Sequence, residues 1–587
     1  MLAALALQDL SGQPDPLAGL HYWFDYGNRK EQTKESVWKD LLRQVIAQGD
    51  GPAIQALTSL RKKLGPHRPI SSKDLSDALK IVCEVQQFVL VLDGPDEMEK
   101  PGNLKAILLP FIKANCRVLV TSRDIPEIRS ALSQASKVEV LADASDLRAY
   151  VGSRFQENDL DELIERHADL ERDILDKSQG IFLLARLLVD HLVDLSTVKE
   201  MRKALQVYPT HLDQAFESSL ERINAQSKSH TTLAHRVMGW IVSAERQLQI
   251  SELTHGLAAE EGVDTIDEEN LVSAKTILRV CGGLVVVQGT AVKMVHSTVH
   301  TWLRNRYDGL YHKDLAESCL RYLTMRLFSS GPAHTVDEMD SRISTFPFFP
   351  YAARHWRRHL DRAECVGAFE SMDRLLDDPG LRSAALQASN YMNSFKCPVV
   401  RTAAFETIPG GHSALHFASY WNLPAKVAKL LSGGGDNNST DTQLWTPLHW
   451  ACFGQSREAV EILVSHNANV NAKDSVGWTP LFWAALKGDT RTVQLLLQNG
   501  TNYAGRDIHD WTALRWAVAS LRMDVVKILL DHHAAALSDP KQRSPALKSL
   551  SVDEASRYLN PPKNETIPHR RTRRYLGRGQ GVRRRVR

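Results

Sequence analysis

The sequence predicts a multidomain protein of the α/β plus α class, with a parallel sheet near its start and a helical solenoid near its end. Two short apolar runs, Phe88–Leu92 and Arg117–Thr121, are separated by a helical pattern, which is typical of parallel strands buried between helices. A strict period of 33 residues from Ser413 onward predicts stacked helical repeats. Amphipathic stretches between these two parts, such as residues 180–193, predict helices.

The chain of 587 residues has an ordinary composition but an uneven charge distribution. Its formal net charge is +3, yet residues 569–587 hold nine arginines and no acidic residue, which leaves −6 for residues 1–568. The seven cysteines are scattered without a CxxC pair, which argues against a disulfide framework or a structural zinc site. No apolar run approaches the ~18 residues of a membrane span. We therefore expect a cytoplasmic protein without membrane association, or a nuclear one through the basic tail.

The first part of the chain alternates between strand and helix patterns. Strands are expected at residues 20–26, 88–92, 117–121 and 137–141, with helices near residues 37–46 and 102–114. Strands joined by helices pair in parallel, with helices on the faces of the sheet.

Acidic residues follow the second predicted strand. Asp93 ends that strand, and Gly94-Pro95 turns the chain before Asp96 and Glu97. Carboxylates at the carboxyl edge of a parallel sheet lie where such sheets bind ligands. The alternative is a strand end followed by the acidic start of a helix. The next strand leads to Arg123, at the same edge of the sheet.

Residues 20–310 resemble the NACHT class of signal-transducing P-loop NTPases. The resemblance identifies Asp93, Asp96 and Glu97 with the acidic Walker B cluster, which holds the magnesium ion. It identifies Arg123 with the sensor arginine, which reaches the γ-phosphate. It implies ATP or GTP with Mg²⁺ as the cofactor. The alternative for Arg123 is a surface ion pair with Asp124.

One motif of this class does not occur in the 587 residues. It is Gly-x-x-x-x-Gly-Lys-Ser/Thr, the Walker A loop, whose backbone N–H groups and lysine hold the phosphates. In the class this loop precedes the aromatic strand, a place that would fall before Met1. The expectation is either a sequence cut after the loop or a protein that has lost its hold on phosphate. Either way we expect weak nucleotide binding and no meaningful hydrolysis, because phosphate positioning supplies most of the catalysis.

Residues 235–305 resemble the winged-helix part of the same class. Residues 284–287 and 291–295 are expected to pair as a hairpin. His296 follows this hairpin, where the class has a histidine that contacts the β-phosphate of ADP. The alternative is a histidine merely packed at a strand end.

Two histidine pairs have a spacing that would suit a metal ion. They are His296 with His300 and His355 with His359, each four residues apart. Neither has an acidic third ligand nearby, so no metal site is predicted.

The repeats are the least ambiguous feature. Four versions of Thr-Pro-Leu-His begin at Ser413, Thr446, Thr479 and Thr512, each 33 residues after the last. Valines at 427, 460, 493 and 526 keep the same interval, and Asp441, Asp474 and Asp507 mark the turns. This string at this period is that of ankyrin repeats. The Ser/Thr hydroxyl is expected to cap the first helix, and the leucine two residues later to be buried.

Tryptophans recur at two positions of the repeat. One column precedes the Ser/Thr position and the other follows the His position: Trp445, Trp478 and Trp511, and Trp450, Trp483 and Trp516. They are candidate partner contacts, because this side of such arrays forms the concave binding face. The alternative is packing between repeats. We expect packing for most of them, and an exposed row for Trp450, Trp483 and Trp516.

These features together resemble an NLR-like protein of the type found in filamentous fungi. The predicted function is regulatory signalling, in which the ankyrin repeats bind a protein partner and an incomplete NACHT module acts as a switch or scaffold. A homo-oligomer is the assembly that the class implies. A second hypothesis is a nucleotide-independent ankyrin scaffold. A third is an adaptor that binds nucleic acid through the Arg-rich tail, if that tail is genuine.

Six parts are expected along the chain. They are a truncated nucleotide-binding domain at 1–142, a helical domain at 143–230, a winged-helix-like domain at 231–308, a helical linker at 309–404, four ankyrin repeats at 405–540, and a C-terminal segment with a disordered Arg-rich tail at 541–587.

Overall fold

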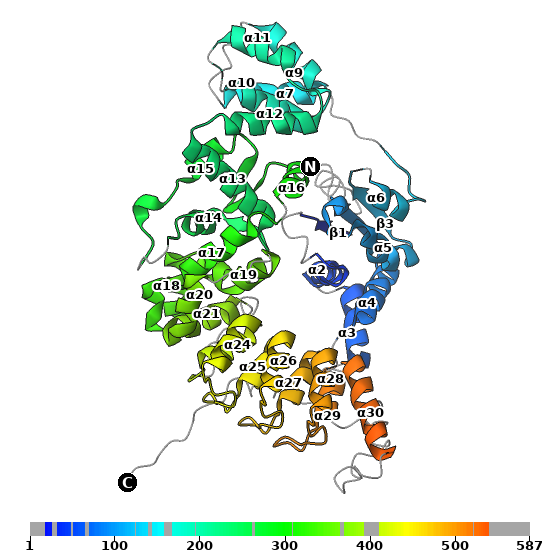
Figure 1. Ribbon diagram of the computed structural model, residues 1–587. Coiled ribbons are helices and arrows are strands. Elements are labelled where there is room, and N and C mark those ends of the chain that lie inside the picture. The colour runs from blue at the N-terminus through cyan, green and yellow to red at the C-terminus, as the bar shows by residue number, and fades with distance from the viewer. Residues whose placement is uncertain are drawn as a thin grey trace, which may run out of the picture. The chain divides into compact units, whose positions relative to one another are not determined.

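The computed structural model describes most of the chain as two compact units. The described residues are 18–25, 32–47, 51–64, 70–123, 125–138, 144–157, 167–193, 195, 197–260, 265–307, 309–363, 369–392, 410–520 and 522–538. One unit lies within Met1–Ile250 and Ser273–Asp308, and the other within Ser251–Val272 and Gly309–Arg587. The fold is mostly helical, with a small parallel sheet and a series of repeated helix pairs (Figure 1). This confirms the predicted combination of α/β and α structure.

The described residues of the first unit include a parallel sheet of three strands in the order β1-β2-β3. The strands are β1 (Ala18–Trp23), β2 (Phe88–Asp93) and β3 (Arg117–Thr121). The helical segments beside them are α2 (Lys34–Ala47), α3 (Pro52–Leu64), α4 (Ser72–Val85), η2 (Pro95–Glu97), η3 (Pro101–Asn103), α5 (Leu104–Lys113) and α6 (Pro126–Ala131). The first three predicted strands and both predicted helices are confirmed as elements. The predicted burial of residues 117–121 is wrong, because Arg117, Val118 and Leu119 are exposed. Of the fourth predicted strand, Lys137 and Val138 lie in neither helix nor strand, and residues 139–141 lie outside the described residues.

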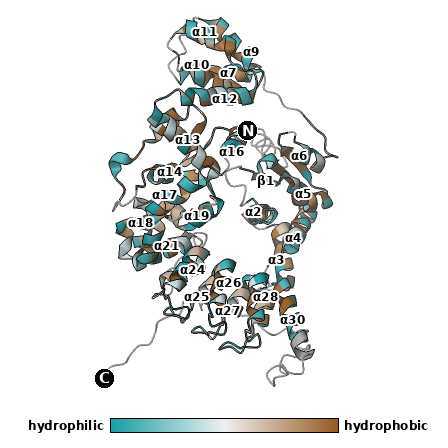
Figure 2. Cartoon of the chain, viewed as in Figure 1, coloured by the Kyte–Doolittle hydropathy of each residue, from teal (hydrophilic) through white to brown (hydrophobic). Residues whose placement is uncertain are grey.

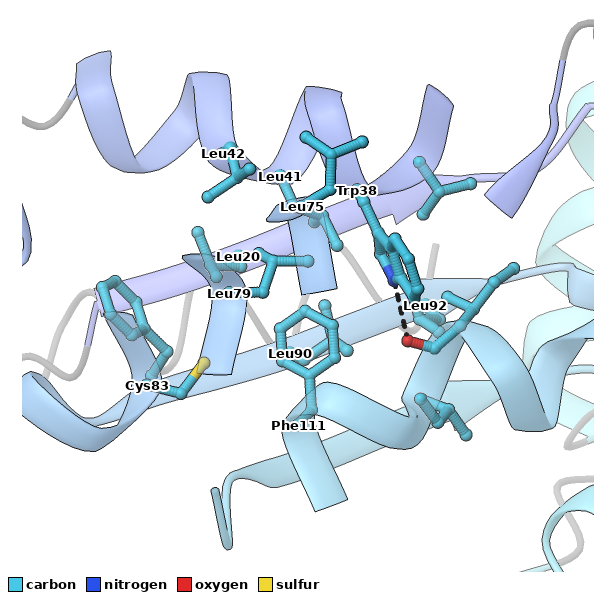
Figure 3. Close-up of a cluster of buried hydrophobic side chains, with 14 of the residues drawn as sticks. Leu20, Trp38, Leu41, Leu42, Leu75, Leu79, Cys83, Leu90, Leu92 and Phe111 are labelled. Carbon is cyan, nitrogen blue, oxygen red and sulfur yellow. Dashed lines mark hydrogen bonds between the residues drawn. The ribbon is translucent and has the colours of Figure 1, made fainter. Parts of the chain in front are cut away.

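The core of this part lies between the sheet and the helices α2, α4 and α5. Leu20 of β1 and Leu90 and Leu92 of β2 point toward these helices, as Figure 3 shows. Trp38 of α2 is buried there, and its indole Nε1–H donates to the Ile107 carbonyl at 3.0 Å. β2 is buried along its apolar length because it lies between two strands, as its continuous apolar run predicts.

Among the described strands, the two outer ones, β1 and β3, have different surroundings. The side-chain amide of Gln44 caps the β1 edge: its oxygen accepts from the His21 N–H at 3.0 Å and its nitrogen donates to the His21 carbonyl at 2.7 Å. Within the described residues, β3 pairs only with β2. Val118 and Leu119 of β3 remain exposed.

A helical region and a small antiparallel sheet complete the first unit. The helices of the region are α7 (Ala144–Gln156), α9 (Ala168–Ser178), α10 (Phe182–Val193), α11 (Val198–Val207) and α12 (Leu212–Asn224). The following elements are α13 (Lys228–Ser243), β4 (Leu248–Gln249), α14 (Ile250–Leu257, all but its first residue in the second unit), η4 (Glu268–Asn270, also in the second unit), α15 (Ala274–Val280), β5 (Val285–Gln288), β6 (Ala291–Met294) and α16 (Ser297–Tyr307). The strand order is β4-β6-β5, and the predicted hairpin is confirmed as β5 and β6. Gly289 in its turn has φ 61°, which glycine adopts without steric cost.

Helices make up most of the second unit. They are α17 (His312–Leu323), η5 (Arg326–Ser330), α18 (Val336–Thr345), α19 (Phe349–Arg362), α20 (Glu370–Asp377), α21 (Pro379–Met392), α23 (Ala414–Tyr420), α24 (Pro424–Ser432), α25 (Pro447–Gly454), α26 (Arg457–Ser465), α27 (Pro480–Lys487), α28 (Thr490–Gln498), α29 (Ala513–Ala519) and α30 (Met523–Ser538). From α23 onward the helices form pairs, and each pair packs on the next (Figure 1). The four predicted repeats are therefore four helix pairs. Residues 541–587, which include the Arg-rich tail, lie outside the described residues.

The helices combine apolar and polar residues rather than forming continuous apolar segments (Figure 2). In the part of the chain that the structure describes, no helix has both the length and the apolar character needed to cross a bilayer.

Candidate functional site

The acidic residues after β2 form a compact turn that faces Arg123. The Arg123 Nε–H donates to Asp96 Oδ2 at 2.5 Å, and the Arg123 backbone N–H donates to Asp96 Oδ1 at 3.2 Å. The Asp96 side chain is only 5% exposed. Asp93 accepts a hydrogen bond from the Thr121 hydroxyl of β3. Glu97, half-buried in η2, donates its backbone N–H to the Gly94 carbonyl at 2.9 Å.

Arg123 also contacts the first turn of α16. Its Nη1–H donates to the Thr298 hydroxyl at 3.1 Å. His296 Nδ1 lies 2.9 Å from the same hydroxyl and accepts the Thr298 backbone N–H at 3.1 Å. Partial desolvation lowers the pKa of His296, the neighbouring Arg123 lowers it further, and Asp96 opposes this. The five predicted residues of this region therefore lie together, and Thr298 joins them.

No sequence pattern singled out Thr298. For Arg123 the sequence left two alternatives, a contact with a nucleotide γ-phosphate and an ion pair with Asp124. Asp124 lies outside the described residues. The ion pair of Arg123 is formed with Asp96, 27 residues earlier, because β2 and β3 are neighbours in parallel and their ends meet at one edge. Thr298 is 175 residues from Arg123, so no local pattern signals this contact.

Two of the acidic residues of this turn are hydrogen-bonded within the protein. The nearest carboxylates are already engaged, Asp96 by Arg123 and Asp93 by Thr121. No group of three His, Cys, Asp or Glu side chains in the described residues is arranged to hold a metal ion. The phosphate-binding string does not occur in the sequence. What the arrangement can do is link the acidic turn to α16 through one guanidinium.

The hydroxyl caps predicted for the repeats are present at Ser413, Thr446 and Thr512, whereas the Thr479 hydroxyl makes no hydrogen bond to its helix. Ser413, Thr446, Thr479 and Thr512 are the N-cap residues of α23, α25, α27 and α29. Each repeat turn is held by an aspartate whose Oδ1 accepts two backbone N–H groups; for Asp441 these are the N–H groups of Gln443 and Trp445, at 2.8 and 2.9 Å. Asp474 and Asp507 repeat this pattern. The predicted leucines are buried in the first three repeats, whereas Leu514 is half-buried.

Two histidines connect successive repeats. His449 Nδ1 accepts the Thr446 backbone N–H at 3.1 Å, so the proton is on Nε2, which donates to the Trp478 carbonyl at 3.1 Å. His416 makes the same pair of contacts, with Ser413 and with the Trp445 carbonyl. Burial lowers the pKa of each histidine to about 4. The neutral form is required because protonated Nδ1 could no longer accept the N–H of the cap residue.

The six tryptophans form a continuous ladder of ring contacts through the repeats. In spatial order the rings are Trp450, Trp445, Trp483, Trp478, Trp516 and Trp511, with centroids 6.3, 4.5, 4.7, 4.8 and 4.8 Å apart. Indole N–H groups of three of them are anchored on turn aspartates: Trp450 on Asp441, and Trp478 and Trp516 on Asp507.

The expected exposed row of tryptophans is wrong. Trp450, Trp483 and Trp516 are exposed by only 4, 6 and 7%, and Trp445 and Trp478 are also buried. A tryptophan of one column packs against a tryptophan of the other column in the next repeat, as Trp445 does with Trp483 and Trp478 with Trp516. Each ring therefore shields its neighbour from solvent. Only Trp511, at the last turn, is half-buried, and the Arg515 guanidinium lies 4.1 Å from its ring centroid. The ladder is packing between repeats, the alternative reading of the pattern.

Leu444 is a residue of the repeat turns that no pattern in the sequence singles out. It has φ 60° and is 49% exposed, whereas the same position holds Gly477 in the next repeat and Asp510 in the one after. A leucine in this left-handed region is strained. Together with exposed Ile508, it places apolar side chains at the turn tips.

We expect Leu444→Gly to raise the free energy of unfolding by about 0.5–1 kcal/mol, because glycine removes the strain of a positive φ. Leu444→Ala is the control, since it shortens the side chain but keeps the strain, and it should give no gain. Urea unfolding measures both. A loss of stability in the glycine variant would show that the leucine side chain stabilises the turn.

The first repeat is docked on the helices before it. The Arg357 side chain of α19 donates to the Trp421 and Asn422 carbonyls, both at 2.7 Å, and so caps the carboxyl end of α23. Lys426 of α24 pairs with Asp373 of α20. These contacts give the outer face of the first repeat a partner within its own unit.

We expect a fragment of residues 405–540 to fold, with a helical circular dichroism spectrum and a cooperative thermal transition, because four repeats supply enough neighbours. A fragment of residues 369–540 should melt several degrees higher, since α20 and α21 then cover the first repeat. Equal melting temperatures would show that these helices do not stabilise the repeats, and an unfolded shorter fragment would contradict the boundary at 405.

Family models match three parts of the chain. A model for the N-terminal part of nephrocystin 3 matches residues 1–123, and one for the winged helix domain of GPI inositol-deacylase matches residues 220–316. A model for ankyrin repeats matches three times, over residues 384–474, 415–507 and 471–544. The chain has the domain order of an NLR-like NACHT protein with C-terminal ankyrin repeats. A search of curated proteins gave no match.

This domain order accounts for where the candidate residues of the NLR-like chain lie. Asp93, Asp96 and Arg123 fall within the first match, and His296 and Thr298 within the second. The turn tips and the tryptophan ladder fall within the ankyrin matches. Ankyrin repeats indicate protein–protein interaction. The general role of the ankyrin part therefore follows directly from its family match.

Proposed function

We propose that this chain is a regulatory signalling protein in which the ankyrin repeats bind a protein partner and the NACHT-like and winged-helix-like parts form a switch. The observation that supports this most directly is the continuous stack of four capped helix pairs, α23 to α30, which presents a series of turn tips with exposed Leu444 and Ile508. Solenoids of this kind use such surfaces for extended contacts with other proteins.

The switch part of the proposal rests on Arg123. Its guanidinium donates to both Asp96 and Thr298, so the acidic turn and α16 are held by one side chain. An anion competing for Arg123 would weaken this link, because the guanidinium cannot satisfy both. In the intact NACHT class that anion is a nucleotide phosphate. For this chain we propose that a nucleotide with Mg²⁺ binds only where a phosphate-binding loop completes the site. The proposed role of the Arg123 contacts with Asp96 and Thr298 does not require the nucleotide.

The nucleotide-independent scaffold remains the second candidate. It is favoured by the engagement of both Asp93 and Asp96 within the protein. The two candidates differ in whether the contact between Arg123 and Thr298 opens when a partner binds.

Partner binding can be tested on the full chain with charge placed at the turn tips. We would quantify proteins captured from a cell extract by mass spectrometry, using wild type, the double variant Leu444→Asp and Ile508→Asp, and the control Met523→Asp. Met523 is 50% exposed and is the first residue of α30, so it belongs to a helix and not to a repeat turn. The proposal expects specific partners with wild type and the control but not with the double variant. Identical capture by all three would contradict the assignment of the tips.

We expect Arg123→Ala to loosen the first turn of α16 and η2 without unfolding the chain. The lost contacts are partly exposed, so amide exchange in these two segments should speed up by roughly fivefold to tenfold while the melting temperature changes little. Lys113→Ala removes an exposed cation at the end of α5 and is the control. Hydrogen-exchange mass spectrometry gives the readout. Unchanged exchange in Arg123→Ala would exclude the link as a restraint.

A further inference from the structure

We propose that Lys487 and Arg522 bind carboxylate groups of the ankyrin partner, so that the partner presents an acidic segment to the third and fourth repeats. This rests on the proposed function, since it names the chemistry of the protein that the repeats bind. Lys487 is the last residue of α27, and Arg522 directly precedes α30. Both therefore lie between the two helices of a repeat, and not at the turn tips.

The Arg522 side chain is held against the end of α27. Its Nε–H donates to the Leu486 carbonyl at 3.1 Å. It also passes close to Gly488, where an added Cβ would lie 2.7 Å from Arg522 Cδ. Gly488 has φ 80°, so a residue without a side chain is favoured there on both counts. The guanidinium is thus positioned beside the third repeat before any partner binds.

Lys487 is the second cation of the site. Its Nζ lies 4.0 Å from the centroid of the Phe453 ring in the preceding repeat, a cation–π contact that positions the ammonium group. Partial burial lowers the pKa of Lys487, and the nearby Arg522 lowers it further. Both effects oppose the charged form, and a bound carboxylate would relieve them. The second repeat has Gly454 at this position, so a repeat folds without a cation there.

The positive charge of this pair is not balanced among the described residues. Neither Lys487 nor Arg522 forms an ion pair with a described carboxylate, and the guanidinium makes no described hydrogen bond besides the one to Leu486. Asp489, two residues after Lys487, accepts the backbone N–H and the hydroxyl of Thr492 at 3.2 and 2.7 Å. The remaining N–H groups of both cations are donors for an acidic ligand.

Capping of α27 does not account for the charge of Arg522. At the equivalent position of the second repeat, the Ser456 hydroxyl donates to the Tyr420 carbonyl at 2.7 Å. This is the bond that the Arg522 Nε–H makes with Leu486 two repeats later. A neutral hydroxyl therefore satisfies the end of such a helix, and the guanidinium adds a charge that the cap does not need.

Charge complementarity and the apolar surroundings indicate an acidic protein segment as the occupant. An arginine guanidinium matches a carboxylate in geometry, and a lysine ammonium adds a point charge. Both cations lie beside half-buried apolar side chains, Phe453 and Leu486. A nucleic acid gains its affinity from a longer row of cations along its phosphates. A second copy of the chain would place like charges together if it docked through the same pair.

The test is a selection of random peptides displayed on phage against the full chain. Individual enriched peptides are then labelled with fluorescein, and their binding is measured by fluorescence anisotropy. Lys487→Gln removes one charge, and Arg522→Ser removes the other while supplying the hydroxyl cap of the second repeat. Arg491→Gln is the matched control, because Arg491 is exposed in α28 of the same repeat as Lys487. Circular dichroism and the melting temperature check that each variant is folded.

The expected result is enrichment of peptides that contain aspartate or glutamate. Their affinity should be about tenfold lower or worse for Lys487→Gln and for Arg522→Ser, and unchanged for Arg491→Gln. Replacing the peptide carboxylates with amides should weaken binding to wild type by a similar factor. The same replacement should have little further effect in the two variants, because the interaction that it removes is already lost.

Three outcomes would overturn the proposal. Peptides that lose affinity for the Leu444→Asp and Ile508→Asp double variant, but not for Lys487→Gln or Arg522→Ser, would exclude the carboxylate site and leave the proposed function standing. Enriched peptides that depend on neither set of residues would contradict both. A fluorescein-labelled oligonucleotide that binds wild type more tightly than the acidic peptides, and is released by Arg522→Ser, would assign the pair to nucleic acid.

Discussion

Replacing Trp483 with alanine is expected to lower the free energy of unfolding of the ankyrin repeats by about 3–5 kcal/mol, the usual cost of truncating a buried tryptophan. Trp483 is at the centre of the ladder. Its ring centroid lies 4.5 Å from that of Trp445, 4.7 Å from that of Trp478 and 5.1 Å from that of Phe453. Its loss would therefore leave a cavity bounded by two repeats, which cannot close without separating them.

The measurement is urea unfolding of the 369–540 fragment and of the full chain, followed by far-ultraviolet circular dichroism. Trp511→Ala is the matched control, because Trp511 ends the ladder and is only half-buried. It should cost less than half as much, or about 1–2 kcal/mol. If the Trp483→Ala variant were instead as stable as wild type but no longer bound a partner, the prediction would be wrong. The tryptophan ladder would then be a binding surface despite its burial in the free protein.

A fall in pH from about 7 to about 5 is expected to destabilise the repeats by about 2–3 kcal/mol in total. His416 and His449 have pKa values lowered to about 4 by burial, against an ordinary value of 6.5. Between these two pKa values the two histidines are protonated in the unfolded chain but neutral in the folded chain. The free energy of unfolding therefore falls as the pH falls from 6.5 toward 4. Each histidine contributes about 2 kcal/mol of this loss at pH 5.

Asp474 works in the opposite direction. Burial raises its pKa to about 6, so the folded chain takes up a proton that the unfolded chain does not, and stability rises as the pH falls from 6 toward 3.8. This offsets about 1.5 kcal/mol at pH 5. Burial also raises the pKa of Asp441, which therefore acts in the same direction as Asp474. The two histidines have the larger pKa shifts and outweigh the aspartates, so the net effect is acid destabilisation.

His449→Phe is the variant that tests the origin of this pH dependence. The chain already holds phenylalanine at the same repeat position, Phe482, so the ring fits the repeat. The variant should lose about 1–3 kcal/mol at pH 7, because the Trp478 carbonyl and the Thr446 N–H lose their partner. It should also lose about half of the histidine contribution to the pH dependence. The exposed His466→Phe is the control, and an equal effect there would contradict the assignment to buried histidines.

Local chemistry made much of the fold predictable. The apolar run at Phe88 specifies a buried strand because few other structures bury every side chain of a short segment. The run at Arg117 specifies a strand too, but its first three residues are exposed. The N-caps of the repeats followed from hydroxyl side chains at a fixed offset from the helices. The turns at Asp441 and its equivalents were also predictable, because each aspartate accepts hydrogen bonds from backbone N–H groups two and four residues later. Each of these features depends on groups that are neighbours in the chain.

The candidate site was predictable in its members but not in its contacts. Proximity at the carboxyl edge of the sheet followed from the parallel arrangement of β2 and β3, which brings Asp96 and Arg123 together. The contact of Arg123 with Thr298 did not, because it joins segments that only folding places side by side. No spacing or composition in the sequence marks it.

The sequence alone determined which tryptophans are equivalent, since the period of 33 aligns Trp450, Trp483 and Trp516 at one position of the repeat. Only the tertiary structure decided that they are buried. Equivalence is a property of one repeat, whereas burial depends on the neighbouring repeat, and here the ring of Trp445 lies against Trp483 and that of Trp478 against Trp516.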